Sequence, residues 1–397
     1  MQHGKDNMKR IPYAHQYIDK SDIKAVAEVL KSDWVTQGPM IKKFEERIAS
    51  YCNAKYAVAV SNGTAALHLA CLAAGITKGD EVITSPITFL ASANCILYCG
   101  GKPVFADVQK DTINIDPKEI KNKINKKTKA LIPVHFAGHP ADMEEIYGLA
   151  KKYKLLVIED AAHALGAEYK GIKVGSGKYS DMTVFSFHPA KSITTGEGGA
   201  ITTNNKKFYE KLLMLRNHGI IKQASHFRSG NPEFIEPWYY EMQDLGFNYR
   251  ITDFQCALGI SQLKKINTFI KKRRKIVCIY NDTFSCVEGI TIPISRSYIK
   301  SSWHIYVLRL KLRNLKKNRS LLFNFLKSKN IQAQVHYIPV YWQPYYRKKL
   351  RYQKGLCPLA EKYYAEALTI PLFPKMSMDE IVHVKNTVSK AISLYSI

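Results

Sequence analysis

An isolated lysine stands in this sequence where a strand-like segment gives way to a glycine-rich turn. Lys191 follows the alternating stretch DMTVFSF at 181–187, and Glu197 is the only other charged residue between positions 185 and 205. Burial among apolar and small groups lowers the pKa of a lysine, and the neutral amine can then condense with a carbonyl to form a Schiff base. A lysine that faces solvent is the alternative interpretation of this residue taken alone.

Two other segments carry groups that could act with this lysine. Asp160 ends the strand-like LLVIED at 155–160, and an acid at the carboxyl end of a parallel strand faces the crevice where such sheets bind ligands. A buried carboxylate is costly without a cation, so Asp160 requires a positive partner unless it only caps a helix. SNGTAALHL at 61–69 follows the strand-like YAVAV and opens a helix, where free N–H groups and the Thr64 hydroxyl could bind a phosphate. An ordinary helix cap is the alternative for this turn.

Taken together, a phosphate-binding turn, a strand-end acid and a desolvated lysine are the parts that a pyridoxal 5′-phosphate (PLP) site requires. The turn anchors the phosphate, the lysine takes the aldehyde, and the acid keeps the ring nitrogen protonated so that the ring accepts electrons. The sequence therefore predicts a PLP site built from Thr64, Asp160 and Lys191.

The segments that must position these residues alternate between strand-like and helix-like patterns. Such alternation predicts an α/β fold with a mostly parallel sheet covered by helices on both faces. After about residue 265 the sequence pattern changes. A long basic helix pattern is followed by the strand-like segments WHIYVLRLKL at 303–312 and QAQVHYIPVY at 332–341. We expect a large domain at 1–265 and a smaller α+β domain with an antiparallel element at 266–397.

Composition narrows the class of protein. The 397 residues carry a formal net charge of +26, with 59 Lys and Arg against 33 Asp and Glu. The basic residues are spread over several segments, such as 121–129, 271–275 and 347–354, rather than gathered in one arm or face. The ordinary interpretation is that these basic segments form solvent-exposed faces. The excess positive charge could also steer anionic small molecules to a site. We expect no nucleic-acid partner.

The cysteines and the N-terminus bear on location. The eight cysteines form no CxxC pair and no zinc spacing, which favours reduced thiols and no metal site. The first residues, MQHGKDNMKR, are polar and show no signal peptide. Residues 82–101 carry no charge but contain a proline and small polar residues, so we read a strand, a turn and a buried helix. We expect a cytoplasmic protein without a membrane partner.

At these motifs the sequence resembles the DegT/DnrJ/EryC1/StrS sugar aminotransferases, which have the aspartate aminotransferase fold (fold type I). The resemblance runs from IPYAHQYID at 11–19 to ALTIPLFPKMSMDEI at 367–381. SNGTAALHL, EDAAHALGA, FSFHPAKSITTGEGGAI and LGFNYRITDFQCALG occur in the family's order and spacing. The resemblance implies a PLP-dependent aminotransferase that works as a homodimer with active sites shared between subunits.

The family also implies roles for individual residues. Lys191 would hold the cofactor and Asp160 would pair with its ring nitrogen. The other implied cofactor contacts are Thr64, the Ala65 backbone, Phe89 stacked on the ring, His163 near the ring hydroxyl, Ser186, and Asn248 reaching across the dimer interface. The implied substrate contacts are Tyr13, Asp33, Trp34, Val35, Thr36, Ala65, Ser186, Asn248, Arg250, Gln334, Val335, His336 and Tyr337. For His163 and His336 a packed core histidine is the alternative, and for Arg250 a structural ion pair.

Within the family, Tyr13, SDWVTQG at 32–38, the histidine of EDAAHALG and AQVHYIPVY at 333–341 resemble the members that aminate C4 of a UDP-linked keto sugar in pseudaminic acid synthesis. The resemblance implies L-glutamate as donor and a UDP-4-keto-6-deoxy-N-acetylhexosamine as acceptor. The alternatives are another nucleotide-sugar C3 or C4 aminotransferase of the family, or a basic regulator with a vestigial PLP site.

Overall fold

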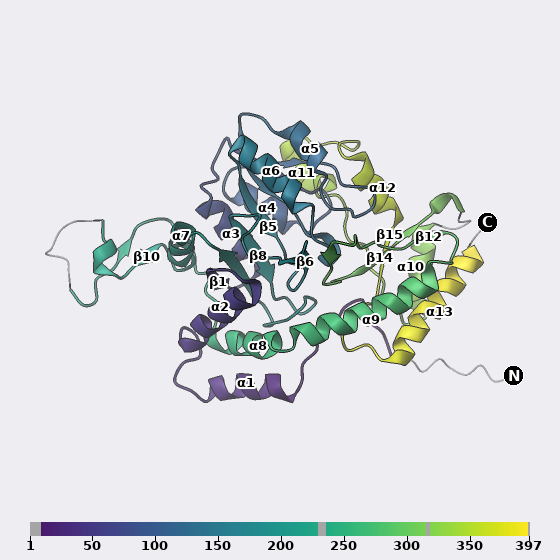
Figure 1. Cartoon of the computed structure of the whole chain (residues 1–397), viewed down its shortest axis with the longest axis horizontal. Coiled ribbons are helices and arrows are strands. Elements are labelled where there is room, and N and C mark those ends of the chain that lie inside the picture. Colours follow the sequence, from purple (N-terminus) through teal and green to yellow (C-terminus); the bar gives the residue numbers. More distant parts are fainter. Residues whose placement is uncertain (1–8, 229–235, 315–317, 396–397) are drawn as a thin grey trace.

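In a computed structural model, which describes residues 9–228, 236–314 and 318–395, the larger part of the chain is built on a seven-stranded sheet (Figure 1). The strand order is β1-β9-β8-β5-β4-β2-β3, and β9 alone runs antiparallel to its neighbours in that sheet. The strands are β1 (Tyr56–Val60), β2 (Glu81–Thr84), β3 (Lys102–Phe105), β4 (Thr128–Ile132), β5 (Leu156–Asp160), β8 (Met182–Ser186) and β9 (Gly199–Thr203). The predicted α/β fold with a mostly parallel sheet is confirmed.

Helices cover both faces of this sheet, which is why its strands read as nearly continuous apolar runs. In β1, Val58 and Val60 pack toward one covering layer while Ala57 and Ala59 pack toward the other. The helices of this part are α1 (Lys20–Leu30), α2 (Pro39–Cys52), α3 (Gly63–Ala73), α4 (Ala91–Tyr98), α5 (Pro117–Lys123), α6 (Met143–Tyr153), α7 (Lys206–Arg216) and α8 (Asp253–Leu263). Residues 82–101 form β2, a turn and α4, as predicted.

The C-terminal part has a second, antiparallel sheet of β12 (Ile290–Thr291), β14 (Tyr306–Leu310) and β15 (Ala367–Ile370). The helices of this part are α9 (Ile266–Phe284), α10 (Arg319–Ser328), α11 (Pro344–Leu350), α12 (Pro358–Glu366) and α13 (Met378–Tyr395). The strand-like pattern at 332–341 yields no strand there, but an isolated bridge from Gln334 to Thr369. The segment turns away because Tyr337 bonds to a residue of the large part, described below.

The long helix α9 belongs to two hydrophobic cores. Its first residues, Ile266 and Ile270, pack with the large sheet, whereas Ile276 and Tyr280 pack with the smaller one. Figure 1 shows α9 reaching from α8 to α10 and α13. We therefore propose that the division between the domains falls within α9 rather than at its start. The N-terminal segment also joins the smaller core, because Ile11 is buried there beside Ile331.

Two short sheets complete the described part of the chain. β6 (Glu168–Tyr169) of the large part pairs with β7 (Ile172–Lys173) on one side and with β13 (Ile299–Lys300) on the other. β10 (Ile220–Ile221) and β11 (Glu241–Met242) form a hairpin that projects beyond α7, at the left of Figure 1. Among the described residues, 3-10 turns lie at Phe136–Gly138, Ala224–His226, Leu312–Asn314 and Val340–Trp342.

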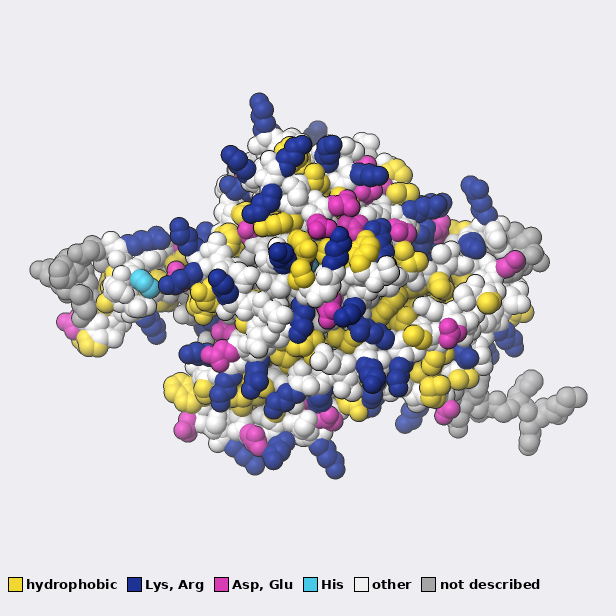
Figure 2. Space-filling model, viewed as in Figure 1, with side chains coloured by type: hydrophobic (Ala, Val, Ile, Leu, Met, Phe, Trp, Pro, Cys, Tyr) yellow, Lys and Arg dark blue, Asp and Glu magenta, His cyan; other side chains and the backbone are white. Residues whose placement is uncertain are grey.

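Lys and Arg side chains are scattered over the face shown in Figure 2, with Asp and Glu between them. All eight cysteines are free thiols, and two of them, Cys278 and Cys286, are exposed. Within the described ranges, no helix combines the length and the apolar character needed to cross a membrane. Residues 1–8 of the polar N-terminus lie outside the described part.

Candidate active site

The predicted site residues lie at one edge of the large sheet because its parallel strands carry their carboxyl ends there. The register places Val60 and Ser186 on either side of Gly199, at the start of β9. Asp160, the last residue of β5, lies opposite Val184 of β8. The ends of β1, β8 and β5 thus meet at the same edge.

Lys191 lies in the loop between β8 and β9. A backbone hydrogen bond from its N–H to the His188 carbonyl, 2.9 Å long, forms a tight turn, and Thr195 N–H donates to the Phe187 carbonyl at 3.0 Å. Burial lowers the pKa of Lys191 to about 8, and the negative charge of Asp160 opposes this shift. A substantial fraction of the amine is therefore neutral near physiological pH, as the sequence predicted for a desolvated lysine.

Asp160 is held by two donors. Its side chain is 5% exposed, accepts a 2.5 Å hydrogen bond from the Ser92 hydroxyl, and accepts a 3.1 Å bond from the Ala162 N–H. Ser92 in turn lies 2.6 Å from the Thr88 hydroxyl. These contacts fix the orientation of the carboxylate, and Ser92 is a contact that the sequence analysis did not find.

A buried hydrogen bond between Glu159 and His135 supports the strand behind Asp160. Glu159 contacts His135 Nε2 at 2.6 Å and accepts a 2.9 Å bond from the Thr183 hydroxyl. The Ala141 N–H donates to His135 Nδ1, so Nε2 carries the proton that His135 gives to Glu159. The His135 N–H also donates to the Asp160 carbonyl at 3.0 Å, which ties β5 to the end of β4.

The turn before α3 is packed too closely for added side chains. A Cβ on Gly63 would lie 2.9 Å from the Ser186 Cβ, and one on Gly199 would lie 2.6 Å from the Asn62 carbonyl oxygen. The N-terminus of α3, Ser186 and the start of β9 are therefore in close contact at positions where only glycine fits. The Ala65 N–H, predicted to bind phosphate, instead donates to the Asn62 side chain at 2.8 Å, because Asn62 caps α3.

One wall of the site is made of buried aromatic and histidine rings. His163 Nε2 lies 3.2 Å from the Tyr337 hydroxyl, and its ring is 4.2 Å from that of His304. Burial, with the charge of Lys191, holds the pKa of His163 well below its usual range, so its ring is neutral. His304 was missed by the sequence analysis, although a histidine inside the apolar run WHIYVLRL is itself an unusual signal.

Three further predicted residues border this wall. The Tyr13 ring lies 5.4 Å from that of His336, whose Nδ1 is 2.8 Å from the Thr369 hydroxyl. Burial and the charge of Lys191 lower the pKa of His336 to about 4. Phe89 lies 6.5 Å from the Tyr337 ring, yet it is 60% exposed, so one of its faces is free to contact a ligand.

The segment that holds Asn248 and Arg250 lies against the turn before α3, where the Ser61 N–H donates to the Tyr249 carbonyl at 2.8 Å. Asn248 pairs with Asn217 in an isolated bridge, and the Arg250 guanidinium donates to the Asn217 side chain at 2.6 Å. The loop before α2 is joined to the same region through a 3.1 Å bond from the Asp253 N–H to the Thr36 carbonyl. No contact described in the structure links Lys191 or Asp160 with Asp33, Trp34, Val35, Thr36, Asn248, Arg250, Gln334 or Val335.

The cluster fits PLP on three observations. His163 Nδ1 is buried without a hydrogen-bond partner, as expected of an atom that a ligand would contact. The turn before α3 packs so closely on its neighbours that a side chain at Gly63 or Gly199 would collide with Ser186 or Asn62. The Lys191 amine is largely desolvated beside the carboxylate of Asp160. In the described part of the chain no three His, Cys, Asp or Glu residues form a group that could hold a metal ion.

This fold and these residues define a PLP-dependent aminotransferase of fold type I. The chain belongs to the DegT/DnrJ/EryC1/StrS aminotransferase family, whose model matches residues 16–389.

Comparison with known proteins agrees. The chain is 41% identical to the Bacillus subtilis spore coat polysaccharide biosynthesis protein SpsC, covering 94% of each chain. It is 40% identical to the UDP-4-amino-4,6-dideoxy-N-acetyl-beta-L-altrosamine transaminase of Campylobacter jejuni, covering 95% of this chain and 96% of that one.

Among solved structures, Helicobacter pylori PseC, an aminotransferase involved in pseudaminic acid biosynthesis, is 32% identical with a TM-score of 0.89, covering 98% of this chain and all of the other. A candidate sugar aminotransferase of Streptococcus pneumoniae in its PLP form is 29% identical with a TM-score of 0.89, covering 97% and 99%. The chain is thus a PLP-dependent sugar aminotransferase.

Proposed function

We propose that this enzyme transfers an amino group from L-glutamate to C4 of a UDP-4-keto-6-deoxy-N-acetylhexosamine. The product would be UDP-4-amino-4,6-dideoxy-N-acetyl-β-L-altrosamine, a precursor for pseudaminic acid and surface glycan. The observation that carries this proposal is the 40% identity, over nearly the whole chain, to the Campylobacter jejuni transaminase named for that sugar. The likeness to PseC supports the same substrate class.

In this proposal Lys191 has two roles. Its amine would hold the cofactor through the aldehyde, and in its free, neutral form the same amine would accept the proton from the α-carbon of the donor. PLP, when bound, supplies a ring that accepts the electrons of that carbon. The pKa of about 8 suits an amine that must both accept and release a proton near neutral pH. Asp160, oriented by Ser92, keeps the ring nitrogen protonated.

The other cofactor contacts follow from the placement of their residues. Thr64, Ser186 and the backbone of the turn before α3 would bind the phosphate at the positive end of the helix dipole. Phe89 would stack on the ring with its exposed face. His163 would present its unpartnered Nδ1 to the ring hydroxyl, held in place by the Tyr337 hydroxyl. The Ala65 N–H could contribute only if the Asn62 cap released it.

Two groups of residues would form the sugar-nucleotide site of a homodimer. Tyr13 and the residues Gln334, Val335, His336 and Tyr337 would line the pocket beside Lys191. The second group, which comprises Asp33, Trp34, Val35, Thr36, Asn248 and Arg250, would serve the partner's site. The projecting hairpin supports a dimer, because Trp238 and Leu245 near it are 76% and 70% exposed. We place the enzyme in the cytoplasm.

The first experiment is the absorption spectrum of the purified protein before and after L-glutamate. We expect the visible band of lysine-bound PLP, its loss with glutamate, and its return when the UDP-4-keto sugar is added. The variant Lys191→Ala should lack both the band and turnover, whereas Lys207→Ala, an exposed lysine of α7, should keep both.

Each other outcome has a distinct meaning. If glutamate bleaches the band and only a C3-keto or GDP-linked sugar restores it, the enzyme is another sugar aminotransferase of the family. If PLP gives no band at all, the regulator hypothesis must be tested by DNA binding at physiological salt.

A further inference from the structure

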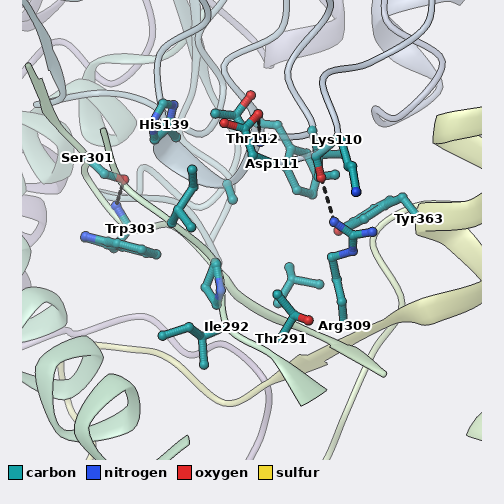
Figure 3. A pocket seen from close by; sticks show the side chains of 16 residues that line it. Lys110, Asp111, Thr112, His139, Thr291, Ile292, Ser301, Trp303, Arg309 and Tyr363 are labelled. Carbon is teal, nitrogen blue, oxygen red and sulfur yellow. Dashed lines mark hydrogen bonds between the residues drawn. The ribbon is translucent and has the colours of Figure 1, made fainter. Parts of the chain in front are cut away.

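A cavity of about 380 Å³ lies between the large and small parts of the chain, and Lys191 is not among the residues that line it. One wall comes from the large part, at residues 110–113 and 136–139, and the other from residues 291–294 and 301–309 with Tyr363 (Figure 3). Phe136, Trp303, Val307 and Tyr363 on its inner side are buried. Lys110, Asp111, Thr291 and Ile294 at its mouth are exposed.

Two arginines of the smaller part link the two walls of the cavity through hydrogen bonds and ion pairs. Arg309 of β14 donates to the Lys110 carbonyl at 2.6 Å while its other nitrogens bind Glu366. Arg296 binds Asp111 at 3.2 Å and Asp142 at 2.9 Å. The cavity is thus formed without a ligand, and its size and position between domains are those of ordinary small-molecule sites.

The chemistry of the lining selects one kind of occupant. The inner surface is mostly apolar, with the rings of Trp303 and Tyr363 on opposite sides in Figure 3. At the mouth, Asp111 shares Arg296 with Asp142, and Arg309 is paired with Glu366, whereas Lys110 has no ion-pair partner in the part of the chain that is described. Lys110 is therefore a cation at the entrance that is available to pair with an anionic group of a ligand. We propose that this cavity is a second ligand site, for a small apolar ring compound that carries one anionic group.

The site shares a wall with the active site. Phe136 lines the cavity, and its ring is 6.4 Å from that of His163 and 6.5 Å from that of Tyr337. The Tyr363 hydroxyl donates to the His336 carbonyl at 2.9 Å. Trp303 directly precedes His304, which packs on His163. A ligand in the cavity would therefore lie one side chain away from the residues behind the proposed cofactor pocket.

The test uses para-trifluoromethylbenzoate and its neutral amide, with binding to the PLP-loaded enzyme followed by fluorine NMR. A compound of this size should bind with a dissociation constant on the order of 1 mM. Ile292→Trp, which fills the cavity with an indole, should abolish binding, and Ile294→Trp at the mouth is a second plug that leaves the inner wall intact. Circular dichroism establishes that each variant is folded.

Charge recognition is tested separately. Lys110→Ala should weaken benzoate binding about two- to fivefold, the usual effect of one exposed charge, and should leave the amide unaffected. Lys207→Ala is the matched control and should change neither. Saturating L-glutamate and UDP should not displace the probe. Binding that persists in both folded tryptophan variants, or that UDP or glutamate displaces, would overturn the proposal, as would an absence of binding to the wild type at several millimolar probe.

Discussion

The reactivity of Lys191 offers a quantitative test of the site. With a pKa of about 8, roughly a quarter of the amine is neutral at about pH 7.5, whereas an ordinary lysine of pKa 10.5 is about one-thousandth neutral. The ratio is about 240. Nucleophilicity falls with basicity, which removes part of this advantage. In the protein freed of PLP, we expect Lys191 to be acylated on the order of 10 times faster than exposed lysines.

The assay is competitive labelling with acetic anhydride at a series of pH values, with each lysine quantified by peptide mass spectrometry. The labelling rate of Lys191 should reach half its maximum near pH 8. The labelling rate of a lysine with the ordinary pKa should still be rising at about pH 10. The midpoint depends only on the proton equilibrium, so partial shielding of Lys191 lowers its rate at every pH without moving the midpoint.

Removal of the Asp160 charge should shift the labelling midpoint of Lys191 in a direction that can be predicted. Its negative charge raises the pKa of Lys191 against the effect of burial. Asp160→Asn should therefore move the midpoint below pH 8, and Asp379→Asn on the exposed first turn of α13 should leave it unchanged. A midpoint near 10 in the wild type, or an upward shift in Asp160→Asn, would refute the reasoning that burial tunes this lysine.

Three further predictions concern the frame around the site. Gly199→Ala places a Cβ against the Asn62 carbonyl and should cost about 1–3 kcal/mol in denaturant unfolding and weaken PLP binding in a titration; unchanged PLP affinity would argue against phosphate binding at this turn. Burial alone would raise the pKa of Glu159, but the hydrogen bonds from His135, Ser180 and Thr183 outweigh it and hold the pKa below its usual value of 4.5. This stabilisation is therefore complete above pH 4.5 and is lost as the pH falls through the folded-state pKa. Glu159→Gln should lose about 1–3 kcal/mol near neutral pH and show a flatter acid-unfolding curve than the wild type, whereas an equal pH dependence would contradict the assignment. Leu245→Asp should convert the proposed dimer to monomers in sedimentation; a wild-type sedimentation coefficient would exclude the hairpin from the interface.

The sequence was most informative where a local pattern and the sheet topology point to the same place. Lys191 and Asp160 follow recognisable strand patterns, and parallel strands bring their carboxyl ends to one edge whatever their exact pairing. The turn before α3 could be recognised for the same reason. These residues were predictable because each lies within a few positions of a strand end.

The contacts that orient those residues were not predictable in the same way. Ser92 reaches Asp160 from a helix 68 positions earlier in the chain, and His304 reaches His163 from the other domain. The Asn62 cap shows a different difficulty. The sequence SNGTA is the same whether the Ala65 N–H is free to bind phosphate or donates to the Asn62 side chain, as it does here. The segment at 332–341 has an alternating pattern typical of a strand, but the contact of Tyr337 with His163 and the packing of its neighbours decide its path.

The place of Ile11 in the smaller core has a consequence for synthesis on the ribosome. Its N–H donates to the Asn330 carbonyl, and its carbonyl accepts from the Gln332 N–H, so both of its backbone bonds are made by residues about 320 positions later. At about 5–20 residues per second, this segment waits roughly 16–64 s for its partners while the large sheet emerges. A chain released before residue 330 would carry an apolar N-terminal segment without its core, which exposes incomplete chains to aggregation and proteolysis.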